Sequence, residues 1–310
     1  MQNFRRAGIF AFSMMLVMVV GSVLISVLLS KTGSDSLLLQ YGLFYGLQFL
    51  LPILVYFYLT KESPREALRV QLPKAYTFVL AFLFALLVQP ALMLLSAFSS
   101  SLFHNYVDDS MVQYLARPFW ISFLCVAVLP ALFEELICRG IFLSGCKDMN
   151  IYAAALLCGL FFGMLHLNPQ QALYAVFFGA FCALVAIGAD SVWPAILAHG
   201  VINGTQLFLA YRLTDAGIAA EDSAVSSEAL DLAAPTAGLL IVIFILLAMA
   251  IWCLVRIFYI NHREGLLTCR TTESGDAPMP FAGALPGLVW FAAAAVVFTV
   301  ISLVTANAPL

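Results

Sequence analysis

Charged residues are scarce in this chain of 310 residues, which holds 14 Lys and Arg and 17 Asp and Glu, or 10% of its composition. Soluble globular proteins carry about 25% charged residues. Hydrophobic residues make up 63% of the chain, more apolar surface than a soluble fold of this size can bury. The scarcity of charge excludes a soluble globule, and the low polarity excludes a disordered chain. We therefore predict an integral membrane protein.

Several other features are missing. The net charge is −3 and no basic stripe is present, so we expect no nucleic-acid partner. The seven cysteines form no CxxC pair and lie mostly in apolar stretches, which excludes a disulfide framework and a thiolate metal site. The HExxH motif of many zinc proteases is also absent.

Long apolar runs are what the chain has instead. A helix needs about 20 apolar residues to cross the hydrocarbon of a bilayer. Nine runs are candidates: Gly8–Ser30, Leu37–Thr60, Tyr76–Phe98, Phe119–Gly140, Ile151–Leu167, Gln171–Ala189, Val192–Arg212, Ala237–Ile260 and Phe281–Val304. They predict an all-α fold, a polytopic membrane helix bundle of about eight or nine transmembrane helices, with residues 1–310 forming a single integral membrane domain.

Basic residues predict the orientation of this bundle. If the N-terminus is cytoplasmic and the runs alternate, all of the 14 basic residues except Lys31, Arg117 and Arg212 fall on the inner side. Such an excess is what the positive-inside rule requires. We expect a multi-pass protein with a cytoplasmic N-terminus.

Polar residues inside apolar spans are costly, so they indicate function. They form three clusters, in the fourth, fifth and seventh runs: Glu134, Glu135 and Arg139; Phe162 and His166; His199 and Asn203.

Helical spacing assigns these residues to faces. Glu135 and Arg139 are four apart and can pair, whereas Glu134 lies about 100° round the helix without that partner. His199 and Asn203 share a face in the same way. An unpaired carboxylate suits a general base, and imidazoles and an amide can orient water, donate to an oxyanion or bind a metal. The pattern predicts hydrolysis of a peptide bond inside the membrane, with a catalytic core at residues 119–212.

The depth of these residues presents a difficulty. Alternating spans place His166 towards the outer end of the fifth run, while Glu134 and His199 lie nearer the inner half. Two geometries would bring them to one level. Either the fifth helix is short and begins well inside the cytoplasmic boundary of the membrane, or the fourth helix runs on to about Cys146, which moves Glu134 towards the midplane.

Two other functions fit the same residues. Buried carboxylates and histidines also mark ion pathways, as in an ion-coupled transporter, although no inverted repeat is visible. A non-catalytic membrane scaffold or immunity protein of the same fold is the second alternative.

Taken in order, the three clusters resemble those of a known family, the CPBP intramembrane proteases, which comprise type II CAAX prenyl endopeptidases and bacteriocin-processing or immunity (Abi) proteins. The likeness covers about Val128 to Gln206 and rests on Glu134-Glu135-x-x-x-Arg139, Phe162-x-x-x-His166 and His199-x-x-x-Asn203. One departure is Cys138, where the family more often has Phe.

The resemblance implies an endopeptidase that cuts near the C-terminus of prenylated proteins, or cuts other membrane-associated peptides in a bacterial inner membrane. Its partners would be the lipid bilayer and a membrane-associated protein or peptide substrate. By resemblance, Glu134 would activate the attacking water with His166 nearby, and His199 and Asn203 would stabilise the oxyanion. Glu135 and Arg139, with Phe162, would support the site.

A metal is an open question, because the family has been classed both as metalloprotease and as glutamate-dependent. Glu134, His166 and His199 could hold zinc or another divalent metal, but Asn203 is a poor zinc ligand. A Glu134 that bound a metal would be less available as a base. We therefore slightly favour a mechanism without a cofactor.

Overall fold

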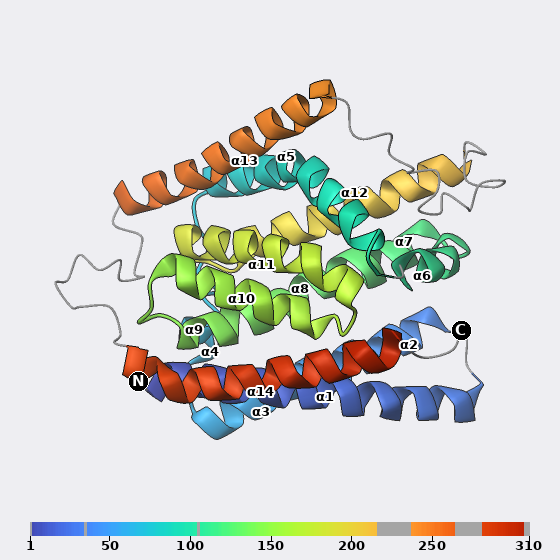
Figure 1. Cartoon of the computed structure of the whole chain (residues 1–310), viewed down its shortest axis with the longest axis horizontal. Helices are drawn as coiled ribbons and strands as arrows, with labels where there is room; N and C mark the ends of the chain where they lie inside the picture. Colours follow the sequence, from blue (N-terminus) through green and yellow to red (C-terminus); the bar gives the residue numbers. More distant parts are fainter. Residues whose placement is uncertain (1, 34–35, 104–105, 216–236, 264–280, 307–310) are drawn as a thin grey trace.

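The computed structural model describes residues 2–33, 36–103, 106–215, 237–263 and 281–306. Within these ranges the chain is almost entirely helical and contains no β-strand (Figure 1). The all-α prediction is therefore confirmed.

The long helical segments coincide with the nine predicted runs. They are α1 (Gln2–Thr32), α2–η1–α3 (Leu37–Tyr45, Gly46–Leu50, Leu51–Thr60), α5 (Ala75–Ser100), α7–η2–α8–η3–α9 (Phe119–Phe123, Leu124–Val128, Leu129–Glu135, Leu136–Phe142, Leu143–Gly145), α10 (Ile151–Leu165), α11 (Pro169–Ala189), α12 (Trp193–Asp215), α13 (Ala237–Arg263) and α14 (Phe281–Ala306). The η segments are π-helical turns. In the described ranges, 7 helices are long and apolar enough to cross a membrane, and α10 is a shorter apolar helix.

The helices form layers. In Figure 1, α1 and α14 run together along one side, and α13 packs on α5 along the opposite side. Between these layers lie α8, α10, α11 and α12, with α10 and α11 forming an antiparallel hairpin. The polar clusters of the sequence therefore belong to the middle of the bundle.

Connections gather at two opposite ends. At one end, Asn3 donates to Asp148 at 3.2 Å and Arg6 pairs with Glu62 at 2.9 Å, joining the N-terminal helix to two connections. At the other end, Tyr211 donates to the Arg117 carbonyl at 2.6 Å. This is the alternation expected of consecutive spans. Which end faces the cytoplasm, and in which membrane, stays a prediction.

Two short helices lie in segments that the sequence indicated only as polar connections. One is α4 (Pro64–Ala67) and the other is α6 (Tyr106–Leu115). The α6 segment has only ten residues and includes Asp108 and Asp109, so no apolar run marks it. It nonetheless contributes to the cavity described below.

Helix lengths bear on how the polar clusters come together. The fourth helical segment continues to Gly145, next to the predicted Cys146. Helix α10 has 15 residues and is about 22 Å long, shorter than the roughly 30 Å of bilayer hydrocarbon. The fifth helix is thus short and the fourth segment runs on almost as far as considered, and Glu134 and His166 line one cavity.

Candidate active site

Two π-helical turns, η2 and η3, flank the short helix α8, which carries the neighbouring carboxylates Glu134 and Glu135. Such turns are rare and often occur at functional sites. Pro130 lies in the first turn of α8 and has no N–H, which removes a regular partner of the Val126 carbonyl. Asn203 of α12 supplies a replacement, since its Nδ2 donates to that carbonyl at 3.0 Å. This bond ties α12 to the helix that carries Glu134.

Glu135 and Arg139 form the predicted pair, with 2.9 Å between Glu135 Oε1 and Arg139 Nη1, and both side chains are fully buried. Arg139 also donates from Nη2 to the Gly179 carbonyl of α11 at 2.9 Å and lies over the Phe162 ring. A buried ion pair needs such additional bonds to offset its desolvation. Glu135 and Arg139 thereby connect the fourth helical segment to α10 and α11.

His199 lies between the two neighbouring carboxylates. Its Nδ1 is 2.9 Å from Glu135 Oε1 and its Nε2 is 4.0 Å from Glu134 Oε2. The Glu135 carboxylate, paired with Arg139, can only accept, so Nδ1 carries the hydrogen of this bond. The rings of Phe162 and Phe178 meet the imidazole edge-on. The bond to Glu135 therefore directs Nε2 towards Glu134.

His166 stands at the end of α10. Its Nδ1 is 2.8 Å from the Phe162 carbonyl, and because a carbonyl only accepts, this nitrogen donates. Nε2 of the neutral ring is then an acceptor. Phe162, predicted as a supporting residue, also makes an edge contact with this ring.

Glu134 has different surroundings from Glu135. Its Oε1 accepts a hydrogen bond from the Tyr45 hydroxyl at 3.3 Å, and its side chain is 14% exposed. Among the described residues, no Lys or Arg lies within ion-pair distance of Glu134. It is therefore a carboxylate without a permanent cation, as the spacing predicted.

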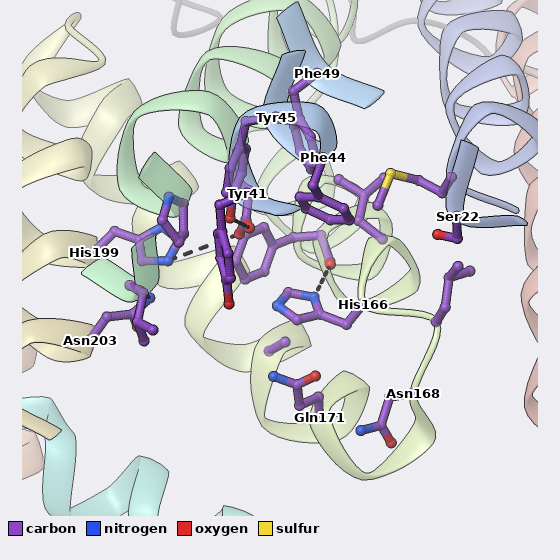
Figure 2. Close-up of a pocket in the computed structure, with 18 of the residues that line it drawn as sticks. Ser22, Tyr41, Phe44, Tyr45, Phe49, His166, Asn168, Gln171, His199 and Asn203 are labelled. Atoms are coloured by element: carbon purple, nitrogen blue, oxygen red, sulfur yellow. Dashed lines mark hydrogen bonds and ion pairs between the residues drawn. The ribbon is translucent and has the colours of Figure 1, made fainter. Parts of the chain in front are cut away.

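A cavity of about 860 Å³ joins the clusters. Its polar lining consists mainly of Tyr41, Tyr45, Tyr114, Glu134, His166, Gln171, His199 and Asn203. In Figure 2, His199 and Asn203 approach from one side and His166 and Gln171 from the other, with Tyr41 and Tyr45 between them. Apolar residues, including Ile25 and Leu29 of α1, line a further part of the wall.

The structure thus places the four predicted catalytic residues, Glu134, His166, His199 and Asn203, around one cavity. Sequence reasoning missed the tyrosines that share it. Tyr41 and Tyr45 are four residues apart in an apolar span, the same signal that marked the other clusters. Tyr41 is hydrogen-bonded to Tyr114 of α6 at 2.6 Å.

The fit of a metal can be judged from the same side chains. Within the described ranges, no three His, Cys, Asp or Glu side chains converge closely enough to hold an ion. Glu134, His166 and His199, the set considered for zinc, thus line the cavity without forming a ligand cluster as placed. We derive no catalytic step through a metal.

The comparison with protein-family models agrees with the resemblance. Residues 116–205 match the family model described as Type II CAAX prenyl endopeptidase Rce1-like. This range contains all seven residues of the predicted site and its support. No curated protein and no solved structure matches the chain.

Proposed function

From the match of residues 116–205 to a protease family, we propose that the chain is an intramembrane endopeptidase in which Glu134 activates the attacking water. The observation that carries this proposal is the contrast between the neighbouring carboxylates. Glu135 is fully buried in an ion pair, whereas Glu134 faces the cavity beside His199. A base needs a carboxylate that is free to take a proton.

The reaction is hydrolysis of a peptide bond. Glu134 takes one proton from water while the water oxygen bonds to the carbonyl carbon, and the C–N bond then breaks as the proton passes from Glu134 to the departing nitrogen. His166 accepts a hydrogen bond from the same water through Nε2, which its bond to Phe162 leaves as an acceptor.

His199 and Asn203 serve the oxyanion in this proposal. Because Nδ1 of His199 donates to Glu135, donation to an oxyanion requires a second proton on Nε2, and so the imidazolium form. Asn203 uses one amide hydrogen for Val126 and has a second that can point into the cavity. A preorganised donor of this kind contributes about 10²–10³ in rate.

The substrate class follows from the cavity wall. A membrane-associated protein or peptide places its scissile bond at the polar residues and an apolar portion along the α1 residues, such as Ile25 and Leu29. A prenylated CAAX-type C-terminus is one substrate of this description, and other membrane peptides are another.

The test is a comparison of membrane peptides in cells that carry the wild-type chain or Glu134→Gln. We expect a set of C-terminal or internal fragments to disappear in the variant. Glu62→Gln is the matched control, because Glu62 is a half-buried carboxylate that pairs with Arg6 outside the cavity. Identical fragments with wild type and Glu134→Gln would contradict the mechanism and favour a scaffold or a transporter.

A second arm addresses the cofactor. Purified wild-type protein is incubated with a strong chelator and then with a peptide that it cleaves. We expect unchanged cleavage, whereas loss that zinc restores would replace the glutamate mechanism by a metal-dependent one.

A further inference from the structure

Tyr45 makes the one tyrosine contact to the proposed base in the described part of the chain: its hydroxyl lies 3.3 Å from Glu134 Oε1. We propose that Tyr45 is a positioning residue, which holds the Glu134 carboxylate in the orientation that faces the attacking water. This inference rests on the proposed function, because positioning has a catalytic consequence only if Glu134 is the base.

The tyrosine is itself held rigidly. It is 4% exposed, and its ring stacks on Phe133, the residue before Glu134, with 5.5 Å between centroids and 18° between planes. Phe44 and Phe49 contact the ring from other directions. The π-helical turn η1 begins at Gly46, directly after Tyr45. The hydroxyl therefore has few alternative positions, and it fixes the carboxylate that it contacts.

Each oxygen of Glu134 has a separate neighbour. Tyr45 contacts Oε1, and His199 Nε2 lies 4.0 Å from Oε2. With Oε1 occupied by a donor, Oε2 is the oxygen that is turned towards His199. A fixed carboxylate directs its proton transfer, and displacement by about 1 Å can cost about 10²-fold in rate.

The neutral hydroxyl suits this task better than a cation. A Lys or Arg at this position would form a charge-assisted bond and stabilise the ionised carboxylate, making it a weaker base. Glu135 illustrates that arrangement, since Arg139 pairs with it at 2.9 Å. Tyr45 can orient Glu134 without bringing a positive charge of its own to the carboxylate, so the hydroxyl weakens the base less than a cation would.

The test is the kinetics of Tyr45→Phe on a cleaved membrane peptide. Phe retains the ring that stacks on Phe133 and removes only the hydroxyl. We expect kcat to fall between about tenfold and hundredfold, with KM within about twofold of wild type and an unchanged unfolding temperature.

Tyr56→Phe is the matched control. Tyr56 also donates to a carboxylate, Glu62 Oε2 at 2.8 Å, but lies outside the cavity of the site. Its kinetics should equal those of wild type. A general effect of losing a tyrosine hydroxyl in these helices would lower activity in both variants and overturn the inference.

A second background tests whether Tyr45 acts through Glu134. In Glu134→Asp the shorter side chain no longer reaches the hydroxyl, so Tyr45→Phe should add less than about a twofold loss. The same large loss in this background would overturn positioning.

Glu134→Gln, measured in parallel, separates the two proposals. If Glu134→Gln is inactive and Tyr45→Phe has wild-type kcat, the inference about Tyr45 alone fails. If Glu134→Gln retains wild-type activity, the proposed function fails, and the role of Tyr45 fails with it.

Discussion

Glu134 and Glu135 are neighbours in the chain, yet their surroundings differ. Glu135 is fully buried and lies 2.9 Å from both Arg139 Nη1 and His199 Nδ1. Glu134 lines the cavity, where its Oε1 accepts from the Tyr45 hydroxyl and its Oε2 lies 4.0 Å from His199 Nε2. One residue step on a helix, about 100°, is enough to separate a structural carboxylate from a candidate base.

The buried carboxylate Glu135 supports the part of the bundle in which Glu134 faces the cavity. The buried ion pair of Glu135 and Arg139 connects its own helical segment to α11 through the Gly179 carbonyl and to α10 through the Phe162 ring. His199 Nδ1 donates its hydrogen to the same carboxylate. The bond to Glu135 therefore orients the imidazole so that its other nitrogen, Nε2, faces Glu134. The difference between the two carboxylates can be tested by removing their partners separately.

Arg139→Leu should have the largest effect on stability. It leaves the Glu135 carboxylate buried without its cation, which costs about 3–5 kcal/mol. The measurement is the free energy of unfolding in a membrane mimetic.

Arg6→Leu is the control for Arg139→Leu. It breaks a pair of the same 2.9 Å length, Arg6 with Glu62, whose side chains are 41% and 30% exposed. Exposed pairs contribute only about 0–1 kcal/mol. Equal losses in the two variants would contradict the structural role that we assign to the buried pair.

Gly179→Ala should have the next largest effect. A Cβ at this position would lie 2.9 Å from Gly159 Cα and 3.0 Å from Phe162 Cβ, so α10 and α11 must separate and disturb the carbonyl that Arg139 binds. Overpacking of this kind costs about 1–3 kcal/mol, measurable as a lower unfolding temperature.

Gly42→Ala provides the comparison, because in the described part of the chain no atom beyond the local helix backbone lies within 4 Å of a Cβ built there. It should leave stability within about 1 kcal/mol of wild type, and on the stabilising side. Destabilisation by Gly42→Ala as large as that by Gly179→Ala would show that the close packing of α10 on α11 is not the cause.

Asn203→Ala should destabilise the protein less than Arg139→Leu or Gly179→Ala and should have a larger effect on cleavage. The Val126 carbonyl loses its side-chain partner, and because this bond is only partly buried the cost is about 0.5–1.5 kcal/mol. If the second amide hydrogen serves the oxyanion, kcat should fall about 10²-fold as well. An unfolding transition shifted as expected, with unchanged kcat, would assign Asn203 to structure alone.

Much of this arrangement could be predicted from the sequence, because it depends on spacing within single helices. The interval of four between Glu135 and Arg139 predicted their pair, and the expected spans coincide with the helices.

What could not be predicted depends on contacts between distant segments. Asn203, 77 residues from Val126, supplies the missing donor. Tyr45, 89 residues from Glu134 in the chain, contacts its carboxylate from another helix. Helix α6 was not predicted, because its segment has the short length and the charged residues of a connection. The position of His166 relative to Glu134 could not be predicted, because it depends on where the helices end, and hydropathy locates helix ends poorly.

The most direct test of the account is the cleavage of one identified membrane peptide by purified Glu134→Gln, after its unfolding temperature has been measured. The substitution keeps the size of the side chain and removes the carboxylate that we propose as the base. We predict a wild-type unfolding temperature and a loss in kcat of about 10²–10⁴-fold, the contribution of a general base. Wild-type kcat in this variant would contradict the central claim that Glu134 activates the water.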